Sequence, residues 1–185
     1  MMPMITMLLT IAISTRPAAA TGEKVDPTKM TCEAFVALAQ AEQPRVLAWL
    51  DGYARAGRPA TAVPVAIEKE VDVIAAACRE TPKQSLWQKV RAKLPGGSKQ
   101  TVSDPAKMTC EEFVKLGRQV QPEVAYWLDG YNQGAEQGGT DTAGTKREGG
   151  VGVPLVALDR DVALMVKECR EAPQESLWER IKTRF

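Results

Sequence analysis

An internal repeat constrains the fold of this chain more than any other feature of the sequence. Asp26–Tyr53 matches Asp104–Tyr131 without gaps, with 18 of 28 positions identical. A second block, Val71–Arg91, matches Val162–Lys182 in the same way. Self-similarity of this kind indicates two copies of one structural unit. The sequence therefore predicts a tandem duplication.

The two matching blocks place the boundaries of the repeats. Repeat 1 covers residues 26–94 and repeat 2 covers residues 104–185, and the Gly- and Ser-containing segment 95–103 between them is predicted to be a linker. Because the two blocks lie further apart in repeat 2 than in repeat 1, repeat 2 contains an insertion. The insertion falls in 138–153, where the many Gly and Thr residues predict an enlarged loop.

Helix start signals occur at matching places in the two repeats. In repeat 2, Thr109 and Glu112 have the spacing of a capping box and predict a helix that starts between them. Repeat 1 keeps the corresponding Thr31 but has no acid three residues later. Pro44 and Pro122 are placed as first-turn prolines of a second helix, in which apolar residues recur at helical spacing.

Two further helices complete each predicted unit. In repeat 1 a third helix follows Pro64 and ends near Cys78, and a fourth begins at Thr81 and carries Leu86 and Trp87. No segment shows the strict alternation of a strand. The predicted fold class is all-α, with two tandem small four-helix domains.

The four cysteines are the strongest structural signal. Each repeat carries two, Cys32 and Cys78 in repeat 1 and Cys110 and Cys169 in repeat 2. Three pairings are possible, and the equal distribution favours one disulfide within each repeat. A unit of about 70 residues obtains only about 3–5 kcal/mol from its core, so a disulfide worth roughly 4 kcal/mol is a large contribution. A metal site or a redox site is disfavoured, since the chain has neither a Cys-x-x-Cys motif nor a histidine.

The first twenty residues resemble a secretory signal peptide. A short apolar run is followed by Ala18 and Ala20 in the small-x-small pattern, which predicts cleavage after Ala20 and export to a bacterial periplasm. The alternative is a first helix of the folded domain. Export would place the cysteines in an oxidising compartment.

Composition disfavours several classes of function. The chain has 24 Lys and Arg against 23 Asp and Glu, so no excess positive charge points to nucleic acid. The absence of His removes the usual nucleophile–base arrangements and most metal sites. No cofactor motif is present, and we expect a protein that is not an enzyme.

Asp51 and Asp129, in the repeated Trp-Leu-Asp-Gly-Tyr segment, are candidates for sensing pH. The alternative is that they are solvated acids on a helix face. Gly52 and Gly130 follow them, and a glycine inside a helix predicts either a helix end or the close approach of another backbone. The four Trp residues lie at core spacing, with an inter-repeat or client-facing role as the alternative for Trp49 and Trp127.

The repeats resemble the HdeA/HdeB family of periplasmic acid-stress chaperones. The resemblance is carried by Lys-Met-Thr-Cys-Glu-Glu-Phe-Val at 107–114, by the Gln121 and Pro122 that follow, and by the block from Val73 to Leu86 around the second cysteine. It implies disulfide-stapled helical domains that are idle near neutrality and in acid bind unfolding periplasmic proteins without ATP. Family members are typically single-domain homodimers, so two repeats in one chain imply an intramolecular pseudo-dimer, independent repeats or a homodimer.

The resemblance also implies a client-binding surface, formed by the apolar stretch after Gln-Pro and by the loop before the third helix. By motif position this client-binding set is Val46, Leu47, Trp49, Leu50, Val63, Val65 and Ile67 in repeat 1, and Val124, Trp127, Leu128, Val153, Leu155 and Val156 in repeat 2.

Charge arithmetic is compatible with activation by acid. Without residues 1–20 the side chains balance at 23 against 23, and protonation of the carboxylates would leave a charge of +23. The lack of His places the trigger at roughly pH 2–5. The alternative function is an interaction or inhibitor module that binds one folded partner at neutral pH.

Overall fold

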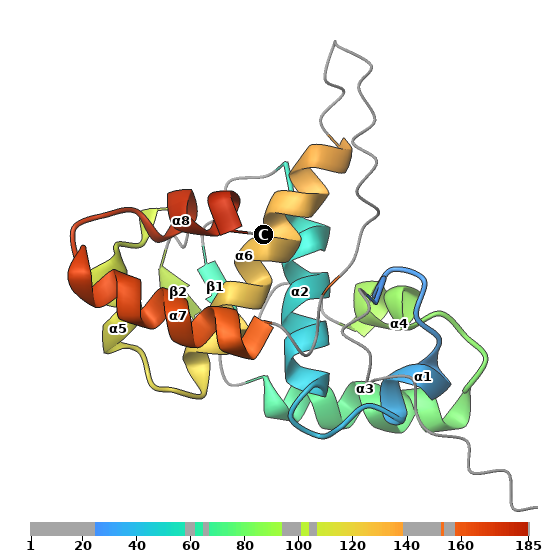
Figure 1. The fold of residues 1–185 in the computed structure, drawn as a ribbon. Coiled ribbons are helices and arrows are strands. Elements are labelled where there is room, and N and C mark those ends of the chain that lie inside the picture. The colour runs from blue at the N-terminus through green and yellow to red at the C-terminus, as the bar shows by residue number, and fades with distance from the viewer. Residues whose placement is uncertain are drawn as a thin grey trace, which may run out of the picture.

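The computed structural model describes residues 25–57, 62–64, 67–93, 101–103, 107–138, 153 and 158–184 (Figure 1). The predicted signal peptide, 1–20, and most of the predicted loop at 138–153 lie outside the described residues. Repeat 1 contains the helices α1 (Cys32–Val36), α2 (Gln43–Arg55), α3 (Glu68–Glu80) and α4 (Leu86–Lys93). Repeat 2 contains α5 (Cys110–Lys115), α6 (Val120–Gly138), α7 (Leu158–Glu171) and α8 (Leu177–Arg184). The all-α fold of two four-helix units is confirmed.

The helix starts follow the capping residues. Thr109 accepts a hydrogen bond from the backbone of Glu112, whose side chain bonds back to the Thr109 N–H, so the predicted capping box is present. In repeat 1 the side chain of Thr31 accepts from the backbone of Ala34, which has no reciprocal group. Pro44 lies in the first turn of α2, as predicted.

The start of the fourth helix is a correction. We predicted it at Thr81, but α4 begins at Leu86. The residues between them form turns, because the carbonyl oxygens of Pro82 and Gln84 accept the N–H groups of Glu33 and Cys32, each at 2.9 Å. The N–H groups at the start of α1 thus occupy carbonyl oxygens that an α4 beginning at Thr81 would use for its own hydrogen bonds.

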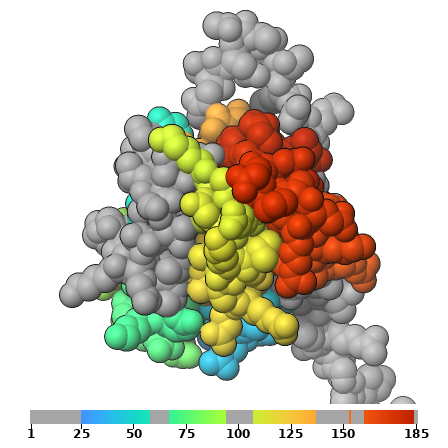
Figure 2. All heavy atoms as spheres, turned by 90° about the vertical axis from the view of Figure 1, so that its left-hand side faces the viewer, coloured from blue at the N-terminus to red at the C-terminus, as the bar shows by residue number. Residues whose placement is uncertain are grey.

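One disulfide lies within each repeat, as favoured by the distribution of the cysteines. Cys32 bonds Cys78 between α1 and α3, and Cys110 bonds Cys169 between α5 and α7, each with a Cα–Cα distance of 4.7 Å. In Figure 2 the yellow residues around α5 lie against the red C-terminal helices on one face of the molecule. The disulfides therefore tie each short first helix, α1 or α5, to the third helix of its own repeat.

The two repeats meet through their second helices. In Figure 1, α2 and α6 lie side by side in the centre, with the other repeat 1 helices on one side and those of repeat 2 on the other. The buried core runs through both repeats and includes the largest fully buried side chains, Trp49 and Trp127.

Backbone pairings between the repeats add a small β component to this helical fold. Strand β1 (Ala62–Pro64) pairs antiparallel with β2 (Thr101–Ser103), which lies in the segment predicted to be the linker. A second antiparallel pair joins Val25 to Val153. Among the described residues, no helix is both long and apolar enough to span a membrane.

Candidate functional site

Two buried carboxylates cross the contact between the repeats. The Asp51 Oδ2 atom accepts a hydrogen bond from the Trp127 indole Nε1 at 2.7 Å, and the Asp129 Oδ2 atom accepts one from the Trp49 Nε1 at 2.8 Å. We call these the carboxylate–indole pairs. The aspartates are only 5% and 1% exposed, so the interpretation as solvated helix-face acids is wrong. A hydrogen bond from a buried N–H to a carboxylate is among the stronger ones in proteins.

Glycine next to each aspartate allows the helices to come this close. A Cβ atom at Gly52 would collide with the Trp127 carbonyl oxygen, and one at Gly130 with the Trp49 carbonyl oxygen. Of the two outcomes predicted for these glycines, the close approach of another backbone is therefore correct. The contact is reciprocal, since each glycine meets the tryptophan of the other repeat.

An aromatic stack extends from each indole into its own repeat. Trp49 stacks on Tyr53 at 5.1 Å between ring centroids, and Tyr53 meets the edge of Trp87 at 5.7 Å. Repeat 2 has the same stack, made by Trp127, Tyr131 and Trp178. Trp49 and Trp127 thus serve both the core and the contact between the repeats.

Most of the client-binding set predicted from the family resemblance lies in α2 and α6. Nine of its members have described side chains, and all are buried: Val46, Leu47, Trp49, Leu50, Ile67, Val124, Trp127, Leu128 and Val153. The backbone of Val63 lies in β1. Val65, Leu155 and Val156 lie outside the described residues. These nine side chains do not form a surface in this structure, so client binding by them requires the structure to open and stays a prediction.

The two carboxylates differ in their second partner, which the sequence analysis missed. Arg55 donates from Nε to Asp51 at 2.8 Å, as an ion pair one helical turn away. At the matching position of repeat 2, Gln133 donates from Nε2 to Asp129 at 2.9 Å. Side chains four residues apart on a helix are neighbours, so the spacing itself predicts both contacts.

Asp26, Glu111 and Tyr53 have shifted pKa values. Burial raises the pKa of Asp26, but hydrogen bonds from Thr28 and Lys29 outweigh it and bring the pKa below the ordinary 3.8. The hydrogen bond and charge of Lys115 lower the pKa of Glu111 below 4.5. Burial and then the charge of Asp26 raise the pKa of Tyr53 above 10.0.

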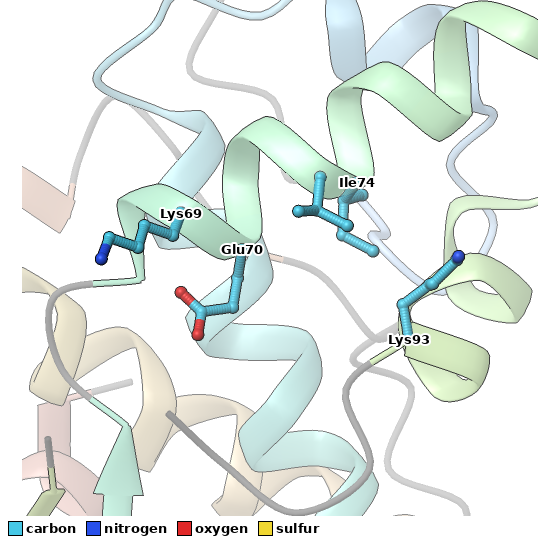
Figure 3. A pocket seen from close by; sticks show the side chains of 5 residues that line it. Lys69, Glu70, Ile74 and Lys93 are labelled. Carbon is cyan, nitrogen blue, oxygen red and sulfur yellow. The ribbon is translucent and has the colours of Figure 1, made fainter. Parts of the chain in front are cut away.

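A shallow pocket lies away from this contact, between α3 and the end of α4. Figure 3 shows Lys69 and Glu70 from the first turn of α3 on one side and Lys93 on the other, with Ile74 between them. The two lysines, the glutamate and the apolar side chains of this pocket do not form a nucleophile–base arrangement. In the part of the chain that the structure describes, no cluster of acids and cysteines could hold a metal ion.

Exposed apolar side chains are few among the described residues. The large ones are Val73, which also lines the pocket, and Leu164, at 55% and 43% exposure. In the alignment of the repeats they occupy matching positions of α3 and α7. Apart from these two, large apolar side chains with described exposure are at least partly buried.

Comparison with known proteins agrees with the presence of two related units in the chain. The HdeA/HdeB family profile matches residues 2–88 and, in a second segment, residues 92–150. The chain belongs to the HdeA/HdeB family. Two matched segments in one HdeA/HdeB chain agree with the tandem duplication that the sequence predicts, and the structure extends the second unit through α7 and α8.

Curated relatives of this HdeA/HdeB chain carry one name. Proteins named "Probable acid stress chaperone HdeA" from Brucella ovis, Brucella suis and Brucella melitensis are each 35% identical to it over 69 residues. The match covers 36% of this chain and 60% of each relative. No solved structure gives a significant match.

Proposed function

We propose that this protein is an acid-activated, ATP-independent holdase chaperone of the periplasm. Near neutrality it is folded and idle, and in acid it exposes apolar surface that keeps unfolding periplasmic proteins soluble. The observation that carries the proposal is that the described members of the predicted client-binding set are buried, most of them in α2 and α6, whose contact two buried carboxylates cross. The names of the Brucella relatives support a chaperone role.

Acid acts on this contact through charge. When Asp51 and Asp129 take up protons, the indole N–H groups face neutral carboxyl groups, and the charge-assisted part of each hydrogen bond is lost. On α2, Arg55 then keeps its charge without its counter-ion. Without residues 1–20 the chain moves at the same time from a side-chain balance of zero towards a net charge of +23, which adds repulsion between the repeats.

The proposal includes the domain organisation predicted from the sequence. Residues 1–20 are removed on export, and repeats 1 and 2 act as an intramolecular pseudo-dimer that separates in acid. The partners are unfolded client proteins, and the role is binding rather than catalysis. Trp49, Trp127 and the apolar residues around them become the client surface.

Light scattering from an acid-sensitive client tests the proposal. The mature, oxidised protein is mixed with the client and the pH is lowered from 7 to 2. We expect suppression of aggregation only in acid. No suppression at any pH, with helical structure and disulfides intact, would overturn the holdase function.

A charge-neutral variant tests the trigger. Asp51→Asn with Asp129→Asn keeps the shape of the side chains and removes their charge at every pH. We expect suppression to begin at a higher pH than in the wild type. The matched control is Asp72→Asn, which neutralises an exposed acid on α3 and leaves the onset unchanged.

Binding to one folded partner at neutral pH is the competing function. It needs apolar surface before acidification, and the described residues offer Val73 and Leu164 for this. A hydrophobic dye separates the two, because the holdase binds it mainly in acid and the partner-binding module binds it similarly at both pH values.

A further inference from the structure

The backbone pairings between the repeats are one contact made twice. Ala62 pairs with Ser103, and Val153 pairs with Val25. Val25 and Ser103 are equivalent in the register of the first repeated block, and Ala62 and Val153 are equivalent in the register of the second. We call Val25 and Thr101–Ser103 the leader residues, and Ala62–Pro64 and Val153 the loop residues.

Each pairing crosses from one repeat to the other. The leader residues precede the first helix of their repeat, directly before Asp26 and Asp104. They pair with the loop that precedes the third helix of the opposite repeat. Val25 and Val153 exchange two hydrogen bonds: the Val25 N–H donates to the Val153 oxygen at 3.0 Å, and the Val153 N–H donates to the Val25 oxygen at 2.7 Å. Separation of the repeats therefore removes the strand partner of both loops.

We infer that each loop is a strand-addition site for an extended segment of an unfolded client, and that the leader residues of the opposite repeat occupy it in the closed state. This inference rests on the proposed function, because the loops become available only when the repeats open. In this view the client is held through its backbone. An unfolded chain offers backbone N–H and C=O groups whatever its sequence, so strand addition suits a binder of many clients.

The position of the loops supports this role. Ile67 and Val153 are buried members of the predicted client-binding set that lie at or beside them. A client segment paired with a loop would therefore lie at or beside one of these apolar side chains, Ile67 in repeat 1 or Val153 in repeat 2. Main-chain hydrogen bonds then add to apolar contact, as in other cases of strand addition.

Proline substitutions on opposite sides of the pairings test the inference. Proline has no N–H, so Ala62→Pro removes the donor of the loop residue equivalent to Val153, and Ser103→Pro removes the donor of the leader residue equivalent to Val25. Neither residue belongs to the predicted client-binding set. Both variants weaken the same closed-state pairing. Only the first also weakens pairing with a client. This makes each variant the matched control of the other.

The two variants are expected to change acid binding of an unfolded client in opposite directions. The loop variant should bind it more weakly, by about fivefold for the donor removed. The leader variant should bind at least as tightly as the wild type, and its suppression of aggregation should begin at a higher pH. Circular dichroism and thiol titration check that both variants are helical and oxidised.

Each other outcome has a definite meaning. Variants that shift in the same direction, or that bind like the wild type, overturn strand addition and leave the holdase function standing. A wild-type chain that suppresses no aggregation in acid overturns the holdase function and the inference with it. In the wild type, amide hydrogen exchange provides a second test, because client binding in acid should protect the N–H groups of Ala62 and Val153, and unchanged exchange contradicts the inference.

Discussion

Adding one methyl group at Gly52 tests whether the close contact of α2 and α6 holds the repeats together. In Gly52→Ala the new Cβ atom would lie 2.9 Å from the Trp127 carbonyl carbon and 3.0 Å from the Tyr131 nitrogen, with the carbonyl oxygen of Trp127 closer still. All of these are backbone atoms that no side-chain rotation can move. The helices must therefore separate.

The cost follows from the contacts that the separation breaks. A shift of about 1 Å lengthens the hydrogen bonds of the carboxylate–indole pairs, now 2.7 and 2.8 Å, beyond useful range. Hydrogen bonds to charged groups contribute about 1.5–3 kcal/mol each, and alanine regains about 1 kcal/mol of helix propensity. We expect a net loss of about 2–5 kcal/mol in the free energy of unfolding.

Urea unfolding and dye binding at neutral pH measure the effect. Gly52→Ala should unfold at lower urea and bind a hydrophobic dye at pH 7, whereas the wild type binds it mainly in acid. Gly117→Ala is the control, because a Cβ atom there meets nothing within 4 Å. A Gly52→Ala protein that is as stable as the wild type and binds no dye at pH 7 would refute the reasoning.

Three further predictions concern other parts of the molecule. Because the pKa of Asp26 is lowered in the folded state, its carboxylate stabilises the fold above pH 3.8, and this stabilisation is lost as the pH falls through the folded pKa. In urea titrations, Asp26→Asn should therefore be less stable than the wild type at pH 7 and equal to it near pH 2. Cys110→Ser with Cys169→Ser opens a 59-residue span and should lower the free energy of unfolding by about 4 kcal/mol, measured by urea unfolding of oxidised protein. Gln133→Arg places a guanidinium one helical turn from Asp129, as Arg55 is placed relative to Asp51, and suppression of client aggregation should then begin at a lower pH.

The helical units could be predicted because their signals are local. The capping box at Thr109 and the first-turn prolines lie within a few residues of the helix starts that they specify. The disulfide pairing could be predicted because the repeat distributes the cysteines equally. The start of α4 could not, since it depends on hydrogen bonds from the N-terminus of α1 to Pro82 and Gln84, which lie beyond α2 and α3 in the chain.

The sequence could not predict which residues meet at the contact between the repeats. Gly52 and Gly130 predicted either a helix end or a close backbone, and did not tell whose backbone it is. The carboxylate–indole pairs join residues 76 and 80 positions apart, and no periodicity connects them. The strand pairings were missed because three-residue strands are too short to show alternation. All three features depend on how two folded units meet, which the internal sequence repeat leaves open.

The central claim is that acid opens the α2–α6 contact and thereby frees the client surface. The most direct measurement follows the Nε1–H signals of Trp49 and Trp127 by NMR while the pH is lowered, beside light scattering from a client under the same conditions. The account predicts that both indole N–H groups lose their protection from hydrogen exchange at the pH where suppression of aggregation begins. Suppression while both N–H groups stay protected would contradict it.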